Sequence, residues 1–237
     1  MIRHHFELRE TITTILADEQ SHIDAAVEGI VRARQDVERC IAGDPFFATT
    51  FEPYTPESDT LVVRRMVSAA ENAGVGPMAA VAGAIAWSGV EAMQKAGAKY
   101  GVVDNGGDIA LFSDHELLVG VHAGGSPVSD RLAFAIPPTR DVLGICTSSA
   151  TVGPSISFGI ADAVCVFSPD VALADAWATA ICNEIRPDDT SVLHRVDLLE
   201  VTGVFCVIGE WTRPYGVLPP LVRANVKSDL ITAGMNL

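Results

Sequence analysis

The sequence lacks any cluster of basic residues, and acidic residues greatly outnumber basic ones. Asp and Glu total 30 against 16 Lys and Arg, which gives a formal net charge of −14 at pH 7. Nucleic acids and anionic membrane surfaces are recognised through patches of positive charge. The composition therefore predicts that neither is a partner. A phosphorylated small molecule is still compatible with this negative net charge, because helix N-termini, glycine loops and a bound cation hold phosphate locally.

Long apolar runs are missing as well. Hydrophobic residues make up 49% of the chain and charged residues 19%, yet no uninterrupted apolar stretch reaches the roughly 20 residues of a membrane span. The first residues, Met1 to Phe6, alternate polar and apolar types and do not form a signal peptide. We expect a cytoplasmic protein.

The standard sequence devices for metals, nucleotides and nucleophiles are also absent. Neither the five scattered cysteines nor the six histidines show the spacing of zinc ligands, so inert reduced thiols are expected. The chain has no Gly-x-Gly-x-x-Gly, no Gly-Lys-Ser/Thr and no nucleophile elbow. Any chemistry must therefore come from less common arrangements.

The apolar pattern predicts strands and helices within one domain spanning residues 1–237. It predicts a strand pair over 6–16 with a turn near Arg9 and Glu10, and helices over 21–41, 61–72 and 78–96. Short strands are expected at 99–103, within 109–136, and at 142–146, 161–167 and 201–208, whereas the tail from Trp211 reads as irregular. This order favours the α+β class, with helices packed on a mixed β-sheet.

The most informative stretch is 102–109, where an apolar run stops at Asn105-Gly106-Gly107-Asp108 and then resumes. Two adjacent glycines permit positive φ and allow main-chain N–H groups to face a ligand. The flanking carboxylate and amide oxygens would surround that opening. The alternative is a plain hairpin turn between two strands.

A second candidate element is the predicted helix over 168–183, with Ser168 as N-cap and Pro169 at its first position. Asp175 and Thr179 are four residues apart, so their oxygens project from one face of the helix. Either Thr179 bonds back to the main chain and Asp175 is a surface residue, or the two oxygens hold a hard cation such as Mg²⁺.

A third element follows the strand predicted at 142–146. Five hydroxyl side chains occur in nine residues from Thr147 to Ser155, beginning with Thr147, Ser148 and Ser149. Such a loop can line a polar cleft and donate to phosphate or ribose, or it can be a solvated turn.

Together the glycine pair, the Thr-Ser-Ser loop and the Ala-Asp-x-x-Ala-Thr helix resemble the ApbE superfamily of flavin-binding, Mg²⁺-dependent FMN transferases. The sequence is more similar still to an uncharacterised ApbE-like family of archaea and anaerobic bacteria. The matching motifs span nearly the whole chain and lie at residues 74–83, 105–108, 147–149 and 155–163.

The resemblance implies a T-fold-like α+β domain that holds FAD or FMN in a cleft. It implies Asp175 and Thr179 as catalytic residues and as ligands of Mg²⁺, together with a main-chain oxygen near Ala80 or Val81. It also places two segments beside the flavin phosphates or ribose. Their residues are Asn105, Gly106, Gly107, Asp108, Thr147, Ser148 and Ser149.

The sequence departs from the transferases at two places. Ala82-Gly83 stands where they carry Lys-Gly, and Pro154 stands where even the closer family usually has a histidine. Three functions therefore remain open: a Mg²⁺-dependent enzyme that cleaves a flavin nucleotide or transfers FMN, a non-catalytic nucleotide binder, and an enzyme of anaerobic sulfur assimilation towards homocysteine. The last would use Cys146 with a lowered pKa. The acidic surface and apolar content also suggest a homo-oligomer.

Overall fold

The computed structural model describes residues 1–152 and 158–225. Pro154 and the first part of the 155–163 motif lie outside the described residues. In the described part, no single helix is long and apolar enough to cross a membrane. The segments Leu61–Ala73 and Pro77–Lys95 together pass that test of length and composition, but they are bent by 108°.

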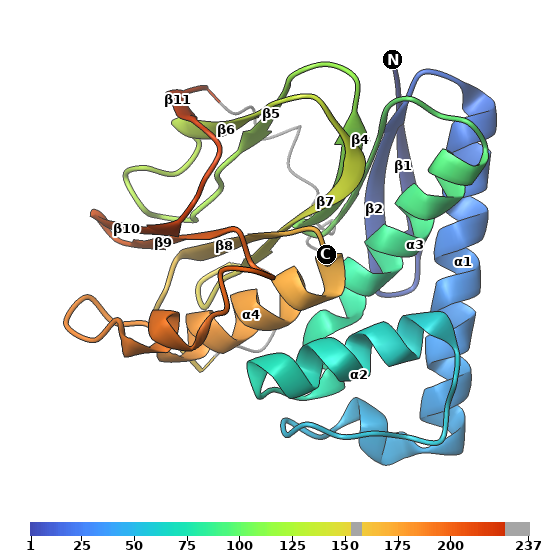
Figure 1. Cartoon of the computed structure of the whole chain (residues 1–237), viewed down its shortest axis with the longest axis horizontal. Coiled ribbons are helices and arrows are strands. Elements are labelled where there is room, and N and C mark those ends of the chain that lie inside the picture. The colour runs from blue at the N-terminus through green and yellow to red at the C-terminus, as the bar shows by residue number, and fades with distance from the viewer. Residues whose placement is uncertain (153–157, 226–237) are drawn as a thin grey trace.

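An eight-stranded sheet forms the centre of the molecule, in the order β1-β2-β3-β4-β7-β8-β9-β10 (Figure 1). A second sheet has the order β11-β6-β5. The strands are β1 (Ile2–Leu8), β2 (Thr11–Ala17), β3 (Gly101–Asn105), β4 (Asp108–Ser113), β5 (Leu117–Gly120), β6 (Leu132–Ile136), β7 (Thr139–Ser148), β8 (Ala163–Ser168), β9 (Gly203–Ile208), β10 (Trp211–Gly216) and β11 (Leu221–Arg223).

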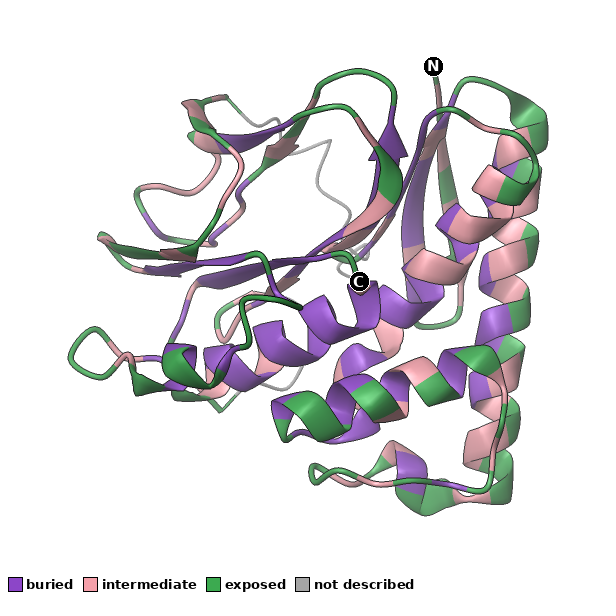
Figure 2. Cartoon of the chain, in the orientation of Figure 1, coloured by how far each residue is buried: buried purple, intermediate pink, exposed green. Residues whose placement is uncertain are grey.

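The α-helices cover one face of the large sheet. They are α1 (Gln20–Gly43), α2 (Leu61–Ala73), α3 (Val81–Lys95) and α4 (Val171–Glu184), and short 3-10 turns lie at Pro45–Ala48, Pro77–Ala80 and Ser191–Arg195. Helix α3 lies over β3 and β4, and α4 lies over β7 and β8. Figure 2 shows that α4 is buried along most of its length, so polar side chains on this helix need partners inside the molecule.

The other face of the large sheet carries the small sheet. Phe134 of β6 meets Phe167 of β8 edge-on at 4.8 Å between ring centroids and Phe205 of β9 at 5.6 Å. The eight-stranded sheet therefore lies between a layer of helices and a second layer of strands. Its helix-facing side contributes to the larger core cluster.

Several predicted elements are confirmed. The first hairpin turns at Arg9 and Glu10, and the helices over 21–41 and 61–72 are present as α1 and α2. Helix α2 ends as expected for a glycine C-cap, since Gly74 has φ 72° and donates its N–H to the Ala70 oxygen.

Other predictions need correction. Every strand pairing in the described chain is antiparallel, so the sheet is not mixed. The helix over 78–96 is divided, because Pro77–Ala80 forms a 3-10 turn before α3 begins. The tail is not irregular: Trp211–Gly216 forms β10 and Leu221–Arg223 forms β11.

The start of α4 also differs from the prediction. The N-cap is Asp170, whose side chain accepts from the Leu173 N–H, and the helix begins at Val171. The Ser168 hydroxyl accepts from the Asp170 N–H and donates to the Glu200 oxygen instead. Asp170 is the N-cap because its carboxylate reaches an N–H group of the first helical turn directly.

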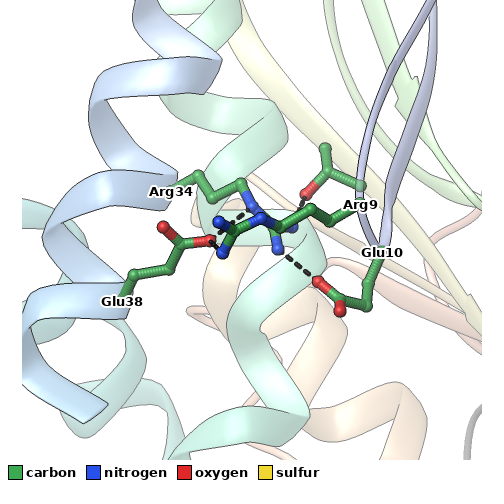
Figure 3. A network of polar contacts seen from close by, with 5 residues as sticks. Arg9, Glu10, Arg34 and Glu38 are labelled. Carbon is green, nitrogen blue, oxygen red and sulfur yellow. Dashed lines mark hydrogen bonds and ion pairs between the residues drawn. The ribbon is translucent and has the colours of Figure 1, made fainter. Parts of the chain in front are cut away.

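A buried arginine joins α1 to the turn between β1 and β2 (Figure 3). The Arg34 guanidinium donates to the Thr11 hydroxyl at 2.6 Å and to the Glu38 carboxylate at 3.0 Å, and it also pairs with Glu10. Arg9 approaches the same Glu38 oxygen at 3.0 Å. The Arg34 side chain is only 11% exposed, so its charge is balanced by this network rather than by water.

We expect Arg34→Met to lower the free energy of unfolding by about 1–3 kcal/mol, because Thr11 loses its donor and α1 loses its polar link to the turn. Arg39→Met is the matched control, since its pair with Asp36 lies on the surface of α1 and is worth about 0–1 kcal/mol. Urea denaturation of both variants measures the difference. Equal losses would contradict the structural role of Arg34.

Candidate functional site

A row of polar side chains crosses three neighbouring strands of the large sheet. Asn105 of β3 is paired with Asp108 of β4, and Asp108 is paired with Cys146 of β7. Directly opposed residues of antiparallel strands share one face of the sheet. The Cys146 thiol donates to the Val171 oxygen at the start of α4, so this row faces the helices.

The glycine pair forms a two-residue hairpin between Asn105 and Asp108. Gly106 and Gly107 have φ values of 69° and 104°, which side chains rarely allow. The Gly107 N–H donates to the Asp104 carboxylate at 2.9 Å and is used within the turn. The hairpin interpretation is therefore confirmed, and the turn contributes to the site through the side chains on either side of it.

Asp175 of α4 is buried, with 7% of its surface exposed, and it reaches the first turn of α3. Its Oδ2 accepts from the Gly83 N–H at 2.8 Å. The N-cap of α3 is Ala80, which has no side-chain acceptor, so Asp175 supplies the cap from a neighbouring helix. Asn105 contacts the same turn, donating from Nδ2 to the Ala82 oxygen at 3.0 Å. Asp175 is thus not an ordinary surface residue.

Gly83 lets α3 and α4 approach each other at this point. A Cβ added there would lie 2.8 Å from the Val171 oxygen and 2.9 Å from the Asp175 Cβ. A glycine inside a predicted helix was the available signal for this close contact.

The negative charge of Asp175 affects the ionisation of Asp108. Burial raises the pKa of Asp108 well above its usual range, and the negative charge of Asp175 raises it further. Asp108 is stabilised in part by the Thr147 N–H, which donates to its Oδ1 at 3.2 Å. Burial raises the pKa of Asp175 to about 7, against the hydrogen bonds from the Gly83 and Ala82 N–H groups. Ionising both groups is costly without a cation.

Thr179 lies one turn beyond Asp175 on α4 and is half-buried. Within the described ranges its hydroxyl makes no hydrogen bond, so the alternative in which Thr179 bonds back to the main chain is not seen. Val81 is the first residue of α3. No group of three or more His, Cys, Asp or Glu side chains suited to a metal occurs in the described residues. Mg²⁺ binds few protein oxygens and takes others from phosphate, and carboxylates such as the neighbouring Asp108 and Asp175 are among the ligands it takes.

The side chains of the Thr-Ser-Ser segment do not all lie on one face of the sheet, because consecutive residues of β7 point to opposite faces. The Thr147 hydroxyl contacts the Cys165 sulfur at 3.3 Å, on the face opposite Cys146. Ser148 lies on the same face as Cys146 and is buried. The Ser149 hydroxyl accepts from the Thr151 and Val152 N–H groups. Only Ser148 therefore shares the face that carries Asp108, and the last hydroxyl of the predicted loop, Ser155, lies outside the described residues.

Cys146 does not have the environment of a reactive thiol. Burial raises its pKa well above 9.0, and the charges of Asp108 and Asp175 add to the effect. The interpretation of Cys146 as a thiolate nucleophile needed a lowered pKa and is wrong.

We expect iodoacetamide at pH 8 to modify Cys40 first in the folded protein, because Cys40 is half-buried and the other four thiols are buried. Burial raises the pKa of Cys165 to about 11 and that of Cys206 to about 12, so their thiolate fractions are small. Modification of Cys146 should be at least about 100-fold slower than that of Cys40. Mass spectrometry measures the order, with urea-denatured protein as the control. Equal rates for Cys40 and Cys146 would contradict the burial.

An exposed aromatic pair lies at the end of α4. Phe51 and Phe158 meet at 5.5 Å between centroids and an interplanar angle of 75°, although 63% and 65% of their surfaces are exposed. The Phe158 N–H donates to the Asn183 Oδ1 in the last turn of α4, and a Cβ on Gly76 would lie 3.0 Å from the Phe51 Cα. The pair thus bridges the end of α4 and the segment leading into α3. Sequence reasoning missed it, because exposure and pairing are tertiary properties.

The family model described as AbpE bacteria matches residues 2–201 of this chain. The UPF0280 protein of Methanoculleus marisnigri is 64% identical over 99% of this chain and 96% of that protein. The UPF0280 protein of Methanoregula boonei is 58% identical over 100% of both chains.

Two solved structures share the fold. The flavin transferase ApbE from Vibrio cholerae, as its H257G mutant, has a TM-score of 0.60 and 12% identity, covering 90% of this chain and 96% of that one. The Pseudomonas stutzeri flavinyl transferase ApbE, apo form, has a TM-score of 0.51 and 13% identity, covering 99% and 97%. The expected ApbE-like α+β architecture is confirmed.

Proposed function

This chain belongs to the AbpE bacteria family, and on that premise we propose that it binds a flavin nucleotide, FAD or FMN, together with Mg²⁺. The observation that carries the proposal is the pair of neighbouring carboxylates, Asp108 and Asp175, beside the first turn of α3. A buried pair of negative charges suits a cation, and phosphate groups suit the positive end of a helix dipole. The flavin transferases that share the fold support the choice of nucleotide.

Each residue has a distinct part in this proposal. Asp175 and Thr179 hold the cation from α4, and Asp108 faces it from β4. A main-chain oxygen near Val81 completes the protein ligands. When bound, Mg²⁺ neutralises charge on the nucleotide phosphates. Asn105 fixes the first turn of α3 through the Ala82 oxygen, and Ser148 lies on the same face of the sheet as Asp108.

The second candidate function is binding of the nucleotide without turnover. Position 82 carries a methyl group where the transferases resembled by this sequence carry a lysine, so no ammonium from this position reaches the phosphates. In a transferase reaction the bond between the FMN phosphorus and the AMP oxygen breaks, and a hydroxyl oxygen bonds to that phosphorus. Asp175 and Thr179 would serve this step only by holding the cation.

Calorimetric titration of FAD and FMN, with Mg²⁺ and then with EDTA, tests the binding proposal. We expect affinity to be at least about tenfold higher with Mg²⁺. Absence of flavin binding under both conditions would overturn it. Incubation of FAD with Mg²⁺, followed by chromatography, then separates the candidates: AMP identifies an enzyme, and intact FAD identifies a binder.

We expect Phe158→Ala to weaken FAD binding by about 5- to 30-fold, because an exposed aromatic platform at the end of α4, the helix that carries Asp175, can stack on a planar ring of the nucleotide. Phe46→Ala is the matched control, since Phe46 is 55% exposed and forms a similar edge-on pair with Tyr54 at 5.0 Å. Titration with FAD and Mg²⁺ measures both variants. Equal effects of the two substitutions would rule out a specific platform.

A further inference from the structure

We propose that two copies of this chain pair through their β1 strands, antiparallel and centred on His5, so that the two large sheets become one continuous sheet. This inference does not depend on the bound nucleotide. It rests on the position of β1 in the sheet, on the direction of its backbone groups and on its sequence.

Strand β1 is the outermost strand at one end of the large sheet (Figure 1). Within the described residues it has a single strand neighbour, β2. An edge strand presents a row of N–H and C=O groups to which another strand can pair. The opposite edge is β10, which contains Pro214 and therefore lacks a donor in its middle. The edges of the small sheet, β5 and β11, have only four and three residues. The seven residues of β1 form the edge best suited to pairing.

The hairpin determines which backbone groups of β1 point outward. Leu8 and Thr11 close a two-residue turn, and the closing pair of such a turn is hydrogen-bonded. Hydrogen-bonded and non-hydrogen-bonded pairs alternate along antiparallel strands. Arg3, His5 and Glu7 are therefore in non-hydrogen-bonded pairs with β2, and their N–H and C=O groups point away from it.

The sequence of β1 is complementary to itself in one register. When His5 lies opposite His5 of the second copy, all seven residues of the strand are paired, and Ile2 lies opposite Leu8. In the same register Arg3 lies opposite Glu7 on both sides of the two-fold axis. A shift by two residues in either direction shortens the overlap and separates these charges. Full overlap, outward backbone groups and opposite charges therefore coincide in a single register.

The monomer fold can keep its core in this dimer. Arg3, His5 and Glu7 are exposed and lie on the face of β1 away from the helices. Ile2 and Phe6 lie on the other face and pack against the main core cluster. Pairing at this edge therefore leaves the apolar face of β1 in the core.

Charge reversal tests the register by sedimentation velocity. We expect the wild type to dimerise and both Arg3→Glu and Glu7→Arg to raise the dimer dissociation constant at least about tenfold, because each places like charges opposite each other. An equimolar mixture of the two variants should dimerise again, since every facing pair is then of opposite sign. Arg32→Glu, an exposed site on α1, is the control and should leave dimerisation unchanged.

Several results would overturn the proposal. A wild type that is monomeric at all concentrations would do so, as would two variants that dimerise like the wild type. A mixture that stays monomeric would contradict the register. Thermal unfolding of each variant confirms that the surface substitutions leave the monomer folded.

Discussion

Asp175→Asn should abolish the Mg²⁺-dependent part of flavin binding, a loss of at least about 100-fold in affinity, while the protein remains folded. The asparagine oxygen can still accept from the Gly83 N–H, which Asp175 Oδ2 now does at 2.8 Å, so the cap of α3 is preserved. The substitution removes the charge that would hold the cation. Calorimetry with FAD and Mg²⁺ measures the affinity, with Asp188→Asn as an exposed control. Retention of wild-type, Mg²⁺-dependent binding would contradict the role of Asp175.

The same variant should change how stability depends on pH. The folded-state pKa of Asp175 is raised from 3.8 to about 7, so the folded protein binds more protons than the unfolded chain between these values. Without a cation, stability is greatest at low pH in this range and falls as pH rises from about 4 to 7. Asp175→Asn cannot ionise and should flatten this slope, making the cation-free protein more stable than the wild type near pH 7. Chemical denaturation at several pH values in EDTA measures the slope. A variant less stable than the wild type at pH 7 would contradict this account.

Gly83→Ala should destabilise the fold by about 2–3 kcal/mol and weaken flavin binding at the same time. The new methyl group would lie 2.8 Å from the Val171 oxygen, 2.9 Å from the Asp175 Cβ and 3.2 Å from its Oδ2. Two of these atoms cannot move without shifting α4, so α3 and α4 must separate. Separation lengthens the hydrogen bond that positions Asp175.

Gly43→Ala is the matched control for Gly83→Ala. Gly43 is the last residue of α1, and a Cβ added there has no neighbour within 4 Å. Replacing an unhindered helical glycine by alanine changes stability by about 0–1 kcal/mol in the favourable direction. Urea denaturation compares the two variants. If Gly83→Ala lowers the free energy of unfolding no more than Gly43→Ala does, the contact between α3 and α4 tolerates a side chain.

Local sequence patterns were sufficient to predict those helices, strands and turns that have a regular apolar spacing or a clear turn residue. The hairpin at Arg9 and Glu10, the amphipathic helix α1 and the end of α2 at Gly74 could all be predicted, because apolar spacing and glycine conformation are local properties. The position of Asp175 and Thr179 on one helix could also be predicted, because two residues four apart share a helical face.

The remainder depends on tertiary structure. Trp211–Gly216 reads as irregular because β10 is an edge strand with no fully buried residue, and so lacks an alternating apolar pattern. Thr147 and Ser148 could not be assigned to faces until the pleat of β7 was known. The proximity of Asp108 to Asp175 depends on the register of β4 and on the packing of α4. It could not be predicted because the two residues are far apart in the sequence. The sequence therefore left open whether the glycines face a ligand or form a plain hairpin turn; the structure shows the turn, with Asn105 and Asp108 on the side that faces the helices.

The most direct test of the site is the location of a cation. Crystals grown with FAD and Mn²⁺, a stand-in for Mg²⁺, can be measured at the manganese absorption edge. We predict an anomalous peak about 2.0–2.2 Å from oxygens of Asp175 and Thr179, with a nucleotide phosphate beside it. An anomalous peak away from Asp175 and Thr179 would contradict the account. FAD bound with no peak at Asp175 would also contradict it.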